Sequence, residues 1–256
     1  MTTLVIARLT FLSYLRQPML WLTTIVGLAF LVLSTVFGMF NFFDADRLRL
    51  VCTAGVAITT LNGLFLGTVG ASSAIGQEFR HRTILVLFAK PISPAGFMAG
   101  KALGIWGATL LSLTIIAAAH LVLIAILARH GFPGSRTFFP PEWVPYHRVA
   151  TGHLLAALNA GVMTCLAAAL AARLGTTTAI VASFAVFIAA HVLAGLGLPS
   201  TVFLPAATLF NIDDSIQSQR FPLNLGYFSL CVLHGALYAS CSLVFGTILM
   251  NRRDLV

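Results

Sequence analysis

Ionisable side chains are concentrated in one connection of an otherwise apolar sequence, between residues 76 and 104. This stretch reads GQEFRHRTILVLFAKPISPAGFMAGKALG, and its six ionisable residues are Glu78, Arg80, His81, Arg82, Lys90 and Lys101. Charged side chains of both signs, held on a short connection, could bind a complementary surface of a partner protein. The alternative is a solvated loop whose basic residues serve only to orient the chain in a membrane.

Turn-forming residues divide this connection in two. The first half contains no Pro or Gly, is charged early and apolar late, and is predicted to form a short surface helix over Gln77–Phe88. Because Pro91 and Pro94 cannot continue a helical ladder, the segment KPISP should end that helix. Ser93 is a favoured N-cap and Pro94 fits the first helical position, so a second helix is predicted to begin there.

Histidines form the second group that could do chemistry. Four of them fall within four different apolar runs: His120, His153, His191 and His234. Two histidines from facing helices could ligate a haem, and three could hold a metal ion. The competing interpretation is that each ring is neutral and hydrogen-bonded inside a helical bundle. From the residues alone both interpretations stay open.

Long apolar segments must position these residues. The chain is 59% hydrophobic and 9% charged, with a mean hydropathy of +0.96, whereas soluble proteins carry about 25% charged residues. Six runs have the length that crosses a bilayer as a helix. They are Met19–Phe40, Val51–Ile75, Lys101–Ala128, Val149–Ala172, Thr177–Leu198 and Gly226–Met250. We therefore expect an all-α polytopic membrane protein with a single transmembrane domain over residues 1–256.

The distribution of charge predicts how these six helices are oriented. With a cytoplasmic N-terminus, the inner segments carry nine basic residues against two acidic ones, and the outer segments six against five. This bias follows the positive-inside rule and places both termini in the cytoplasm. Orientation also explains the net charge of +8, so we expect no nucleic-acid partner.

Three further segments lie outside the predicted spans. Residues 1–18 show apolar residues at helical spacing and are predicted to form an amphipathic helix in the inner interface. Residues 76–100 form the cytoplasmic connection, and the outer connections are residues 129–148 and 199–225. The apolar part of the last is too short to span, so we expect a re-entrant or interfacial helical piece there.

Small residues recur along two of the predicted spans. Gly96, Gly100 and Gly104 form a doubled G-x-x-x-G at the start of the third span, and Gly63 with Gly67 repeats the spacing in the second. Such stripes let helices approach closely, either within one chain or at a seam between two copies. The cysteines lie in spans without metal-site spacing and are predicted to be packing residues.

The charged connection resembles the signature connection of ABC-2 type permeases, the membrane subunits of ABC exporters. The family pattern is a Glu followed by a Thr, then a Pro-x-Ser turn, then Gly-Lys at the start of the third span. The matching positions are Glu78, Thr83, Pro91, Ser93, Gly100 and Lys101. LPAATLFNI at residues 204–212, RQP at residues 16–18 and the terminal NRRDLV also resemble the family. Arg82 and Pro94 depart from it, since Gly and a basic residue are common at these positions.

The resemblance implies a multi-pass subunit of an ATP-driven exporter in the inner, cytoplasmic membrane. Two copies would pair around the path of a lipid-linked or amphipathic substrate, and each would dock an ABC ATP-binding subunit through the Gln77–Phe88 coupling helix. Membrane lipid and a periplasmic accessory protein are further expected partners. The docking residues implied are Glu78, Phe79, Arg80, Arg82, Thr83, Pro91, Ser93, Pro94, Lys101 and Arg173.

The chain itself is not expected to be an enzyme. It has no G-x-x-x-x-G-K-[ST] phosphate loop, so ATP and Mg²⁺ would bind to the partner subunit and no cofactor is expected here. The alternative function is a membrane haem or metal-binding protein that uses the outer histidines. Its candidate ligands are His120, His153, His191 and His234.

Overall fold

Long apolar helices build the structure, a computed structural model that describes residues 2–37, 43–81, 92–132, 139–140, 143–196, 204–205, 207–218 and 223–251. In chain order the helices are α1 (Thr2–Leu15), α2 (Pro18–Ser34), α3 (Asp44–Arg80), α5 (Pro94–His130), α6 (Tyr146–Ala171), α7 (Thr176–Gly195), η3 (Ala207–Phe210), α8 (Asp213–Ser218) and α9 (Leu225–Asn251). A helix satisfies its backbone hydrogen bonds within one segment, as the hydrocarbon of a bilayer requires. Throughout the described ranges every regular element is helical, as predicted.

Five of these helices, α3, α5, α6, α7 and α9, are individually long and apolar enough to cross a membrane. A sixth candidate span exists if α1 and α2, which meet at a bend of 62°, count as one broken span. Gln17 is extended and Pro18 is the first residue of α2, which explains the break in the ladder. The structure is therefore that of a multi-pass membrane protein, and the side on which the termini lie stays a prediction.

The longest helices extend past the bounds that apolarity predicts. α3 and α5 have 37 residues each, which corresponds to about 55 Å at 1.5 Å per residue, against about 30 Å of hydrocarbon. α3 begins at Asp44 instead of Val51 and ends at Arg80 instead of Ile75. Its first turn is acidic and its last turn basic, which suits the helix macrodipole. Charged residues expected in connections are thus helical, and the helix is longer than the predicted span within it.

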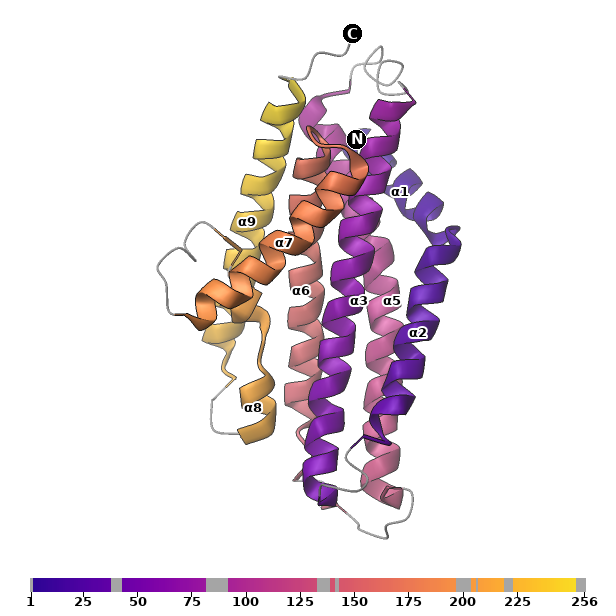
Figure 1. Cartoon of the computed structure of the whole chain (residues 1–256), viewed down its shortest axis with the longest axis vertical. Coiled ribbons are helices and arrows are strands. Elements are labelled where there is room, and N and C mark those ends of the chain that lie inside the picture. The colour runs from indigo at the N-terminus through magenta and orange to yellow at the C-terminus, as the bar shows by residue number, and fades with distance from the viewer. Residues whose placement is uncertain are drawn as a thin grey trace.

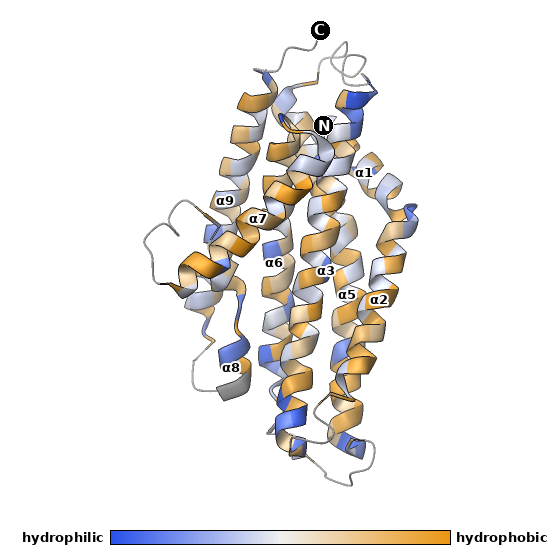
Figure 2. Cartoon of the chain, viewed as in Figure 1, coloured by the Kyte–Doolittle hydropathy of each residue, from blue (hydrophilic) through white to orange (hydrophobic). Residues whose placement is uncertain are grey.

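The helices form an elongated bundle in which α3, α5 and α6 lie side by side (Figure 1). α2 packs against α3 and α5, α9 packs against α6, and α7 crosses obliquely over α3 and α6 (Figure 1). We call the end formed by Arg80, Pro94 and Asn251 the inner end, following the predicted orientation, and the end formed by Asp44, His130 and Tyr146 the outer end. Apolar residues run along the bundle and hydrophilic ones gather toward its ends (Figure 2).

The small-residue stripes are used for packing within this chain. A Cβ on Gly63 would lie 2.9 Å from the Cβ of Ala160, so α3 and α6 touch closely there. A Cβ on Gly100 would lie 2.8 Å from the Cβ of Ile6, so the stripe on α5 receives α1. Contact within the chain, one of the two roles left open by the sequence, is therefore observed at both stripes.

α1 does not have the clean amphipathic character predicted for residues 1–18. Leu4, Val5 and Leu9 are exposed, whereas the polar residues Thr10 and Tyr14 are buried. The reason is that α1 packs against its neighbours with polar and apolar side chains alike, such as Thr10 and Phe11, and both kinds, such as Arg8 and Leu9, are also exposed. A helix of this kind suits contact with lipid along its outer face.

The segment predicted to be re-entrant or interfacial contains two short helices, η3 and α8. Ala207 and Phe210 of η3 are buried. Arg148, at the start of α6, donates from Nη1 to the carbonyl oxygen of Ser215 at 2.8 Å and to its hydroxyl at 2.6 Å. These contacts attach α8 to the outer part of the bundle.

Candidate functional site

An ion pair joins the two helices that flank the charged connection. Lys101 Nζ donates to Glu78 Oε1 at 2.6 Å, and the two side chains are only 15% and 21% exposed. Glu78 lies in the last turns of α3, and Lys101 lies two turns into α5. At this burial the charge-assisted hydrogen bond is screened less than a surface pair. The ammonium also lies 5.7 Å from the centroid of the Phe97 ring.

The start of α5 follows the predicted N-cap chemistry. The hydroxyl of Ser93 accepts a hydrogen bond from the backbone N–H of Gly96 at 3.1 Å. Pro94 occupies the first helical position, where its missing N–H is not needed. These two residues fix where α5 begins and therefore set the position of Lys101 along the helix.

The end of α3 also contacts the turn between α6 and α7. Arg80 Nη2 donates to Thr176 Oγ1 at 3.5 Å, and Gly76 leaves room for the same threonine. Arg173 lies in that turn and is exposed, as is Arg80. Two connections that the sequence predicts to meet the same partner therefore lie next to each other at the inner end.

The remaining predicted docking residues divide into two groups. Phe79 is half-buried and packs against the apolar cluster at the inner end. Arg82, Thr83 and Pro91 lie outside the described residues, as does most of the predicted Gln77–Phe88 helix. The part of that helix that is described, Gln77–Arg80, continues α3. A separate coupling helix therefore stays a prediction.

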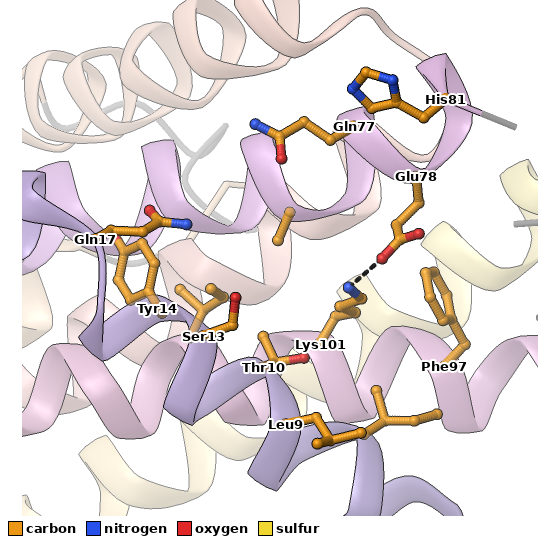
Figure 3. Close-up of a pocket in the computed structure, with 13 residues that line it drawn as sticks. Leu9, Thr10, Ser13, Tyr14, Gln17, Gln77, Glu78, His81, Phe97 and Lys101 are labelled. Atoms are coloured by element: carbon orange, nitrogen blue, oxygen red, sulfur yellow. Dashed lines mark hydrogen bonds and ion pairs between the residues drawn. The ribbon is translucent and has the colours of Figure 1, made fainter. Parts of the chain in front are cut away.

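A pocket opens beside the ion pair, between α1, α3 and α5 (Figure 3). Its volume is about 480 Å³. Polar side chains line it from all three helices: Thr10 and Ser13 from α1 with Gln17 from the link between α1 and α2, Gln77, Glu78 and His81 from the end of α3, and Lys101 from α5. We call it the inner-end pocket. Figure 3 shows Glu78 and Lys101 pointing toward each other across it, with Thr10 and Ser13 projecting from α1.

Tyr14 holds α1 in place at this pocket. Its hydroxyl donates to the carbonyl oxygen of Leu66 at 2.8 Å, and its side chain is buried. Gly70 gives the ring space, because a Cβ there would lie 2.6 Å from the Tyr14 hydroxyl oxygen. The sequence interpretation missed the pocket residues of α1. The glycine stripe on α5 was the one signal that something packs there.

Two of the four candidate histidine ligands come together. His120 Nδ1 lies 2.9 Å from His153 Nε2, and His120 Nε2 lies 3.0 Å from the carbonyl oxygen of Val51. Since a carbonyl only accepts, His120 Nε2 carries the proton and, for neutral rings, His120 Nδ1 accepts from His153. His153 Nδ1 is then a buried acceptor with no hydrogen-bond partner in the described structure.

The other two histidines lie elsewhere. His191 Nδ1 is 3.0 Å from the carbonyl oxygen of Phe187 within α7. His234 stacks between Phe210 and Tyr238, with ring centroids 6.2 Å apart in both cases. Within the described ranges, no three His, Cys, Asp or Glu side chains are grouped so that they could hold a metal ion.

Compared with known proteins, the chain matches no family model and no curated protein. Any functional proposal must therefore be based on the geometry of the site itself. Its parts are the Glu78–Lys101 pair, the adjacent arginines Arg80 and Arg173, and the inner-end pocket.

Proposed function

We propose that the chain is the membrane subunit of an ATP-driven ABC-2 type transporter, an exporter that docks a separate ATP-binding subunit at its inner end. The observation that carries the proposal is the ion pair between Glu78 and Lys101, two positions of the motif that are 23 residues apart. Through this pair, a force applied to the connection between them reaches α3 and α5 together. This is what a coupling element between an ATPase and membrane helices requires.

The exposed charges at the inner end suit a partner with an acidic surface. Arg80 and Arg173 are both exposed; Arg173 lies in the turn between α6 and α7, and Arg80 contacts Thr176, the residue that follows this turn. Basic side chains at the rim of an interface favour association with acidic surfaces and set its orientation. In the proposed complex these two arginines contact the ATP-binding subunit, and Glu78 and Lys101 hold the receiving helices.

α3 is the element that would carry movement from the partner into the bundle. It runs from Asp44 to Arg80 without a break, so its two ends move together. Gly63 and Gly67 bring it into direct contact with α6. A tilt of α3 at the inner end is therefore passed to α6, because closely packed helices shift as rigid bodies. In a pair of such subunits this opens and closes the path between them.

Purification from the native membrane in mild detergent, with ATPase assay, tests the proposal. We expect a stoichiometric nucleotide-binding subunit to copurify, and its ATPase activity to lose its dependence on this chain in the variant Arg80→Glu/Arg173→Glu. Arg129→Glu, an exposed arginine at the outer end, is the matched control and should leave the coupling unchanged. Full coupling in the inner-end variant would show that docking does not occur there.

An absorption spectrum of the same preparation tests the histidine-based alternative. A Soret band would indicate haem, and metal analysis would detect a bound ion. His120 and His153 are hydrogen-bonded directly, at 2.9 Å, so an iron between them would require the two rings to move apart. The transporter proposal predicts that neither haem nor metal is found with the chain.

A further inference from the structure

The inner-end pocket has both polar and apolar lining residues, and the Glu78–Lys101 ion pair alone does not require a pocket of this kind. Its volume of about 480 Å³ lies within the range of about 300–1,000 Å³ that is typical of small-ligand pockets. Polar side chains from α1, α3 and α5 form one part of the lining, and apolar ones, among them Leu9 and Phe97, form the rest. A ligand that fits has a polar head and an apolar body.

The charged and polar groups of this pocket favour an anion. Lys101 contributes an ammonium group to the lining of the pocket. An ammonium has three N–H donors, and one of those of Lys101 is donated to Glu78. The side-chain amides of Gln17 and Gln77 and the ring of His81 add further N–H donors to the lining. The single carboxylate, Glu78, is paired with Lys101. A phosphate group matches such a set of donors.

A shallow groove adjoins the pocket along the elbow between α1 and α2. It is lined by Leu9, Leu12, Ser13, Arg16, Gln17 and Pro18, and three of these residues also line the pocket. Arg16 adds a second cation, and the sequence has no acidic residue before Asp44 to offset it. Pocket and groove together carry one more basic than acidic side chain, without counting His81.

Apolar side chains mark where the rest of the ligand would lie. Leu9 and Leu12, on the outer face of α1, are 63% and 41% exposed. They border the groove and lie on the surface that would meet lipid. Lys101 is seven residues beyond the first residue of α5, which is about 10 Å from the end of that helix. This depth suits a headgroup at the membrane interface better than a molecule in the hydrocarbon.

We propose that the inner-end pocket binds the phosphate headgroup of an anionic glycerophospholipid, whose acyl chains lie along Leu9 and Leu12 of α1. Lys101, Gln77 and His81 donate to the phosphate, and Arg16 attracts it from the adjoining groove. This site goes beyond the proposed transport function and does not depend on an ATP-binding partner. A lipid bound there would fill the space between α1 and the ends of α3 and α5.

Native mass spectrometry of the purified full-length chain tests this assignment. The chain is exchanged into neutral detergent with equal amounts of phosphatidylglycerol and phosphatidylcholine, and the lipid retained per chain is measured. We expect phosphatidylglycerol to be retained preferentially. Lys101→Gln keeps a donor for Glu78 but removes the charge, and should lower that retention about tenfold, as expected for loss of one charge-assisted contact. Arg16→Gln should lower it less.

Two further variants distinguish lipid binding at this pocket from general effects of charge on lipid retention. Arg8→Gln removes an exposed cation of α1 that does not line the pocket, and should retain lipid like the wild-type chain. Ser13→Phe fills the pocket at an exposed position without changing any charge. It should abolish the preference for phosphatidylglycerol, and it keeps the test decisive if Lys101→Gln fails to fold.

Three outcomes would overturn the proposal. The first is equal retention of the two lipids by the wild-type chain. The second is unchanged retention in Ser13→Phe. The third is displacement of phosphatidylglycerol by soluble glycerol 3-phosphate at comparable concentration, which would identify a site for a free phosphate compound and exclude a lipid site.

Discussion

The inner and outer ends of the bundle both place charged side chains at a terminus of α3, but they enclose these charges to different degrees. At the inner end, Glu78 and Lys101 pair beside a pocket that is open to the surroundings. At the outer end, the side chain of Arg47 is only 5% exposed and is in contact on several sides. Charges of the first kind can still be reached by a ligand or partner, whereas those of the second kind can only hold helices together.

Arg47 shows what an enclosed charge does. Its Nη1 donates to Asp44 Oδ1 at 3.1 Å, its Nη2 donates to the carbonyl oxygen of Thr35 at 3.2 Å, and its guanidinium lies 4.1 Å from the centroid of the Phe132 ring. These contacts join the end of α2, the start of α3 and the segment after α5. The pair of His120 and His153 is likewise buried between α3, α5 and α6.

Replacement of Arg47 is expected to have the largest effect on stability. Arg47→Leu breaks a buried pair, leaves Asp44 without its cation, and should lower the free energy of unfolding by about 3 kcal/mol. Arg49→Leu is the matched control, because the Arg49–Asp46 pair has the same spacing but is 3.7 Å long and largely exposed. It should change the stability by about 0.5 kcal/mol or less. Unfolding in mixed detergent measures the free energy of unfolding of both variants. Equal losses would contradict the distinction between enclosed and accessible charges.

The histidine pair should give the next largest effect. His120→Phe leaves His153 Nε2 without its partner in a buried site and removes the side-chain contact of the Val51 carbonyl, which should lower the free energy of unfolding by about 2 kcal/mol. His191→Phe, which removes a half-buried histidine from α7, should lower it by less than about 1 kcal/mol. The same unfolding titration compares the two variants. A neutral His120→Phe would contradict a structural role for the pair.

A charge swap at the inner end should separate stability from function. Glu78→Lys places two cations together and should destabilise the chain by about 1 kcal/mol, since both side chains are partly exposed. Glu78→Lys/Lys101→Glu restores the pair within the chain and should recover that stability. Coupling to the proposed ATP-binding subunit should stay impaired, because Glu78 and Lys101 are also among the docking residues that the resemblance implies, and the swap reverses their charges. Recovery of both properties would limit this pair to a structural role.

The smallest expected effect concerns pH and Asp213, in α8 outside the predicted spans. Burial raises the pKa of its carboxyl above the ordinary 3.8, and nearby Asp214 adds to the shift, against an opposing hydrogen bond from Asn211. The folded chain then binds this proton more tightly than the unfolded chain. Its contribution to stability is therefore full below pH 3.8 and is lost as pH rises through the folded pKa. The difference in unfolding free energy between wild type and Asp213→Asn should follow this slope, and a flat difference would contradict it.

Part of the site could be predicted because its causes are local. Ser93 and Pro94 start α5 as expected, since an N-cap hydroxyl and a first-turn proline act on backbone groups within three residues. The apolar runs predicted helices correctly but not their full bounds, because α3 and α5 continue into charged residues at their ends whereas α2 ends at Ser34, before Phe40. The clean amphipathic character predicted for α1 was wrong, because Thr10 is buried against the bundle whereas Leu4 and Leu9 are exposed.

Sequence by itself determined that this chain is a bundle of apolar helices with its polar chemistry gathered in a few short segments. Segment length, apolarity and capping are properties of neighbouring residues, and they act before any helix meets another. Only the tertiary structure decided that Lys101 meets Glu78, that His120 meets His153, and that α1 closes one side of a pocket. Such contacts depend on the rotation and depth of each helix against its neighbours, and these are set by close packing at positions such as Gly63 and Gly100.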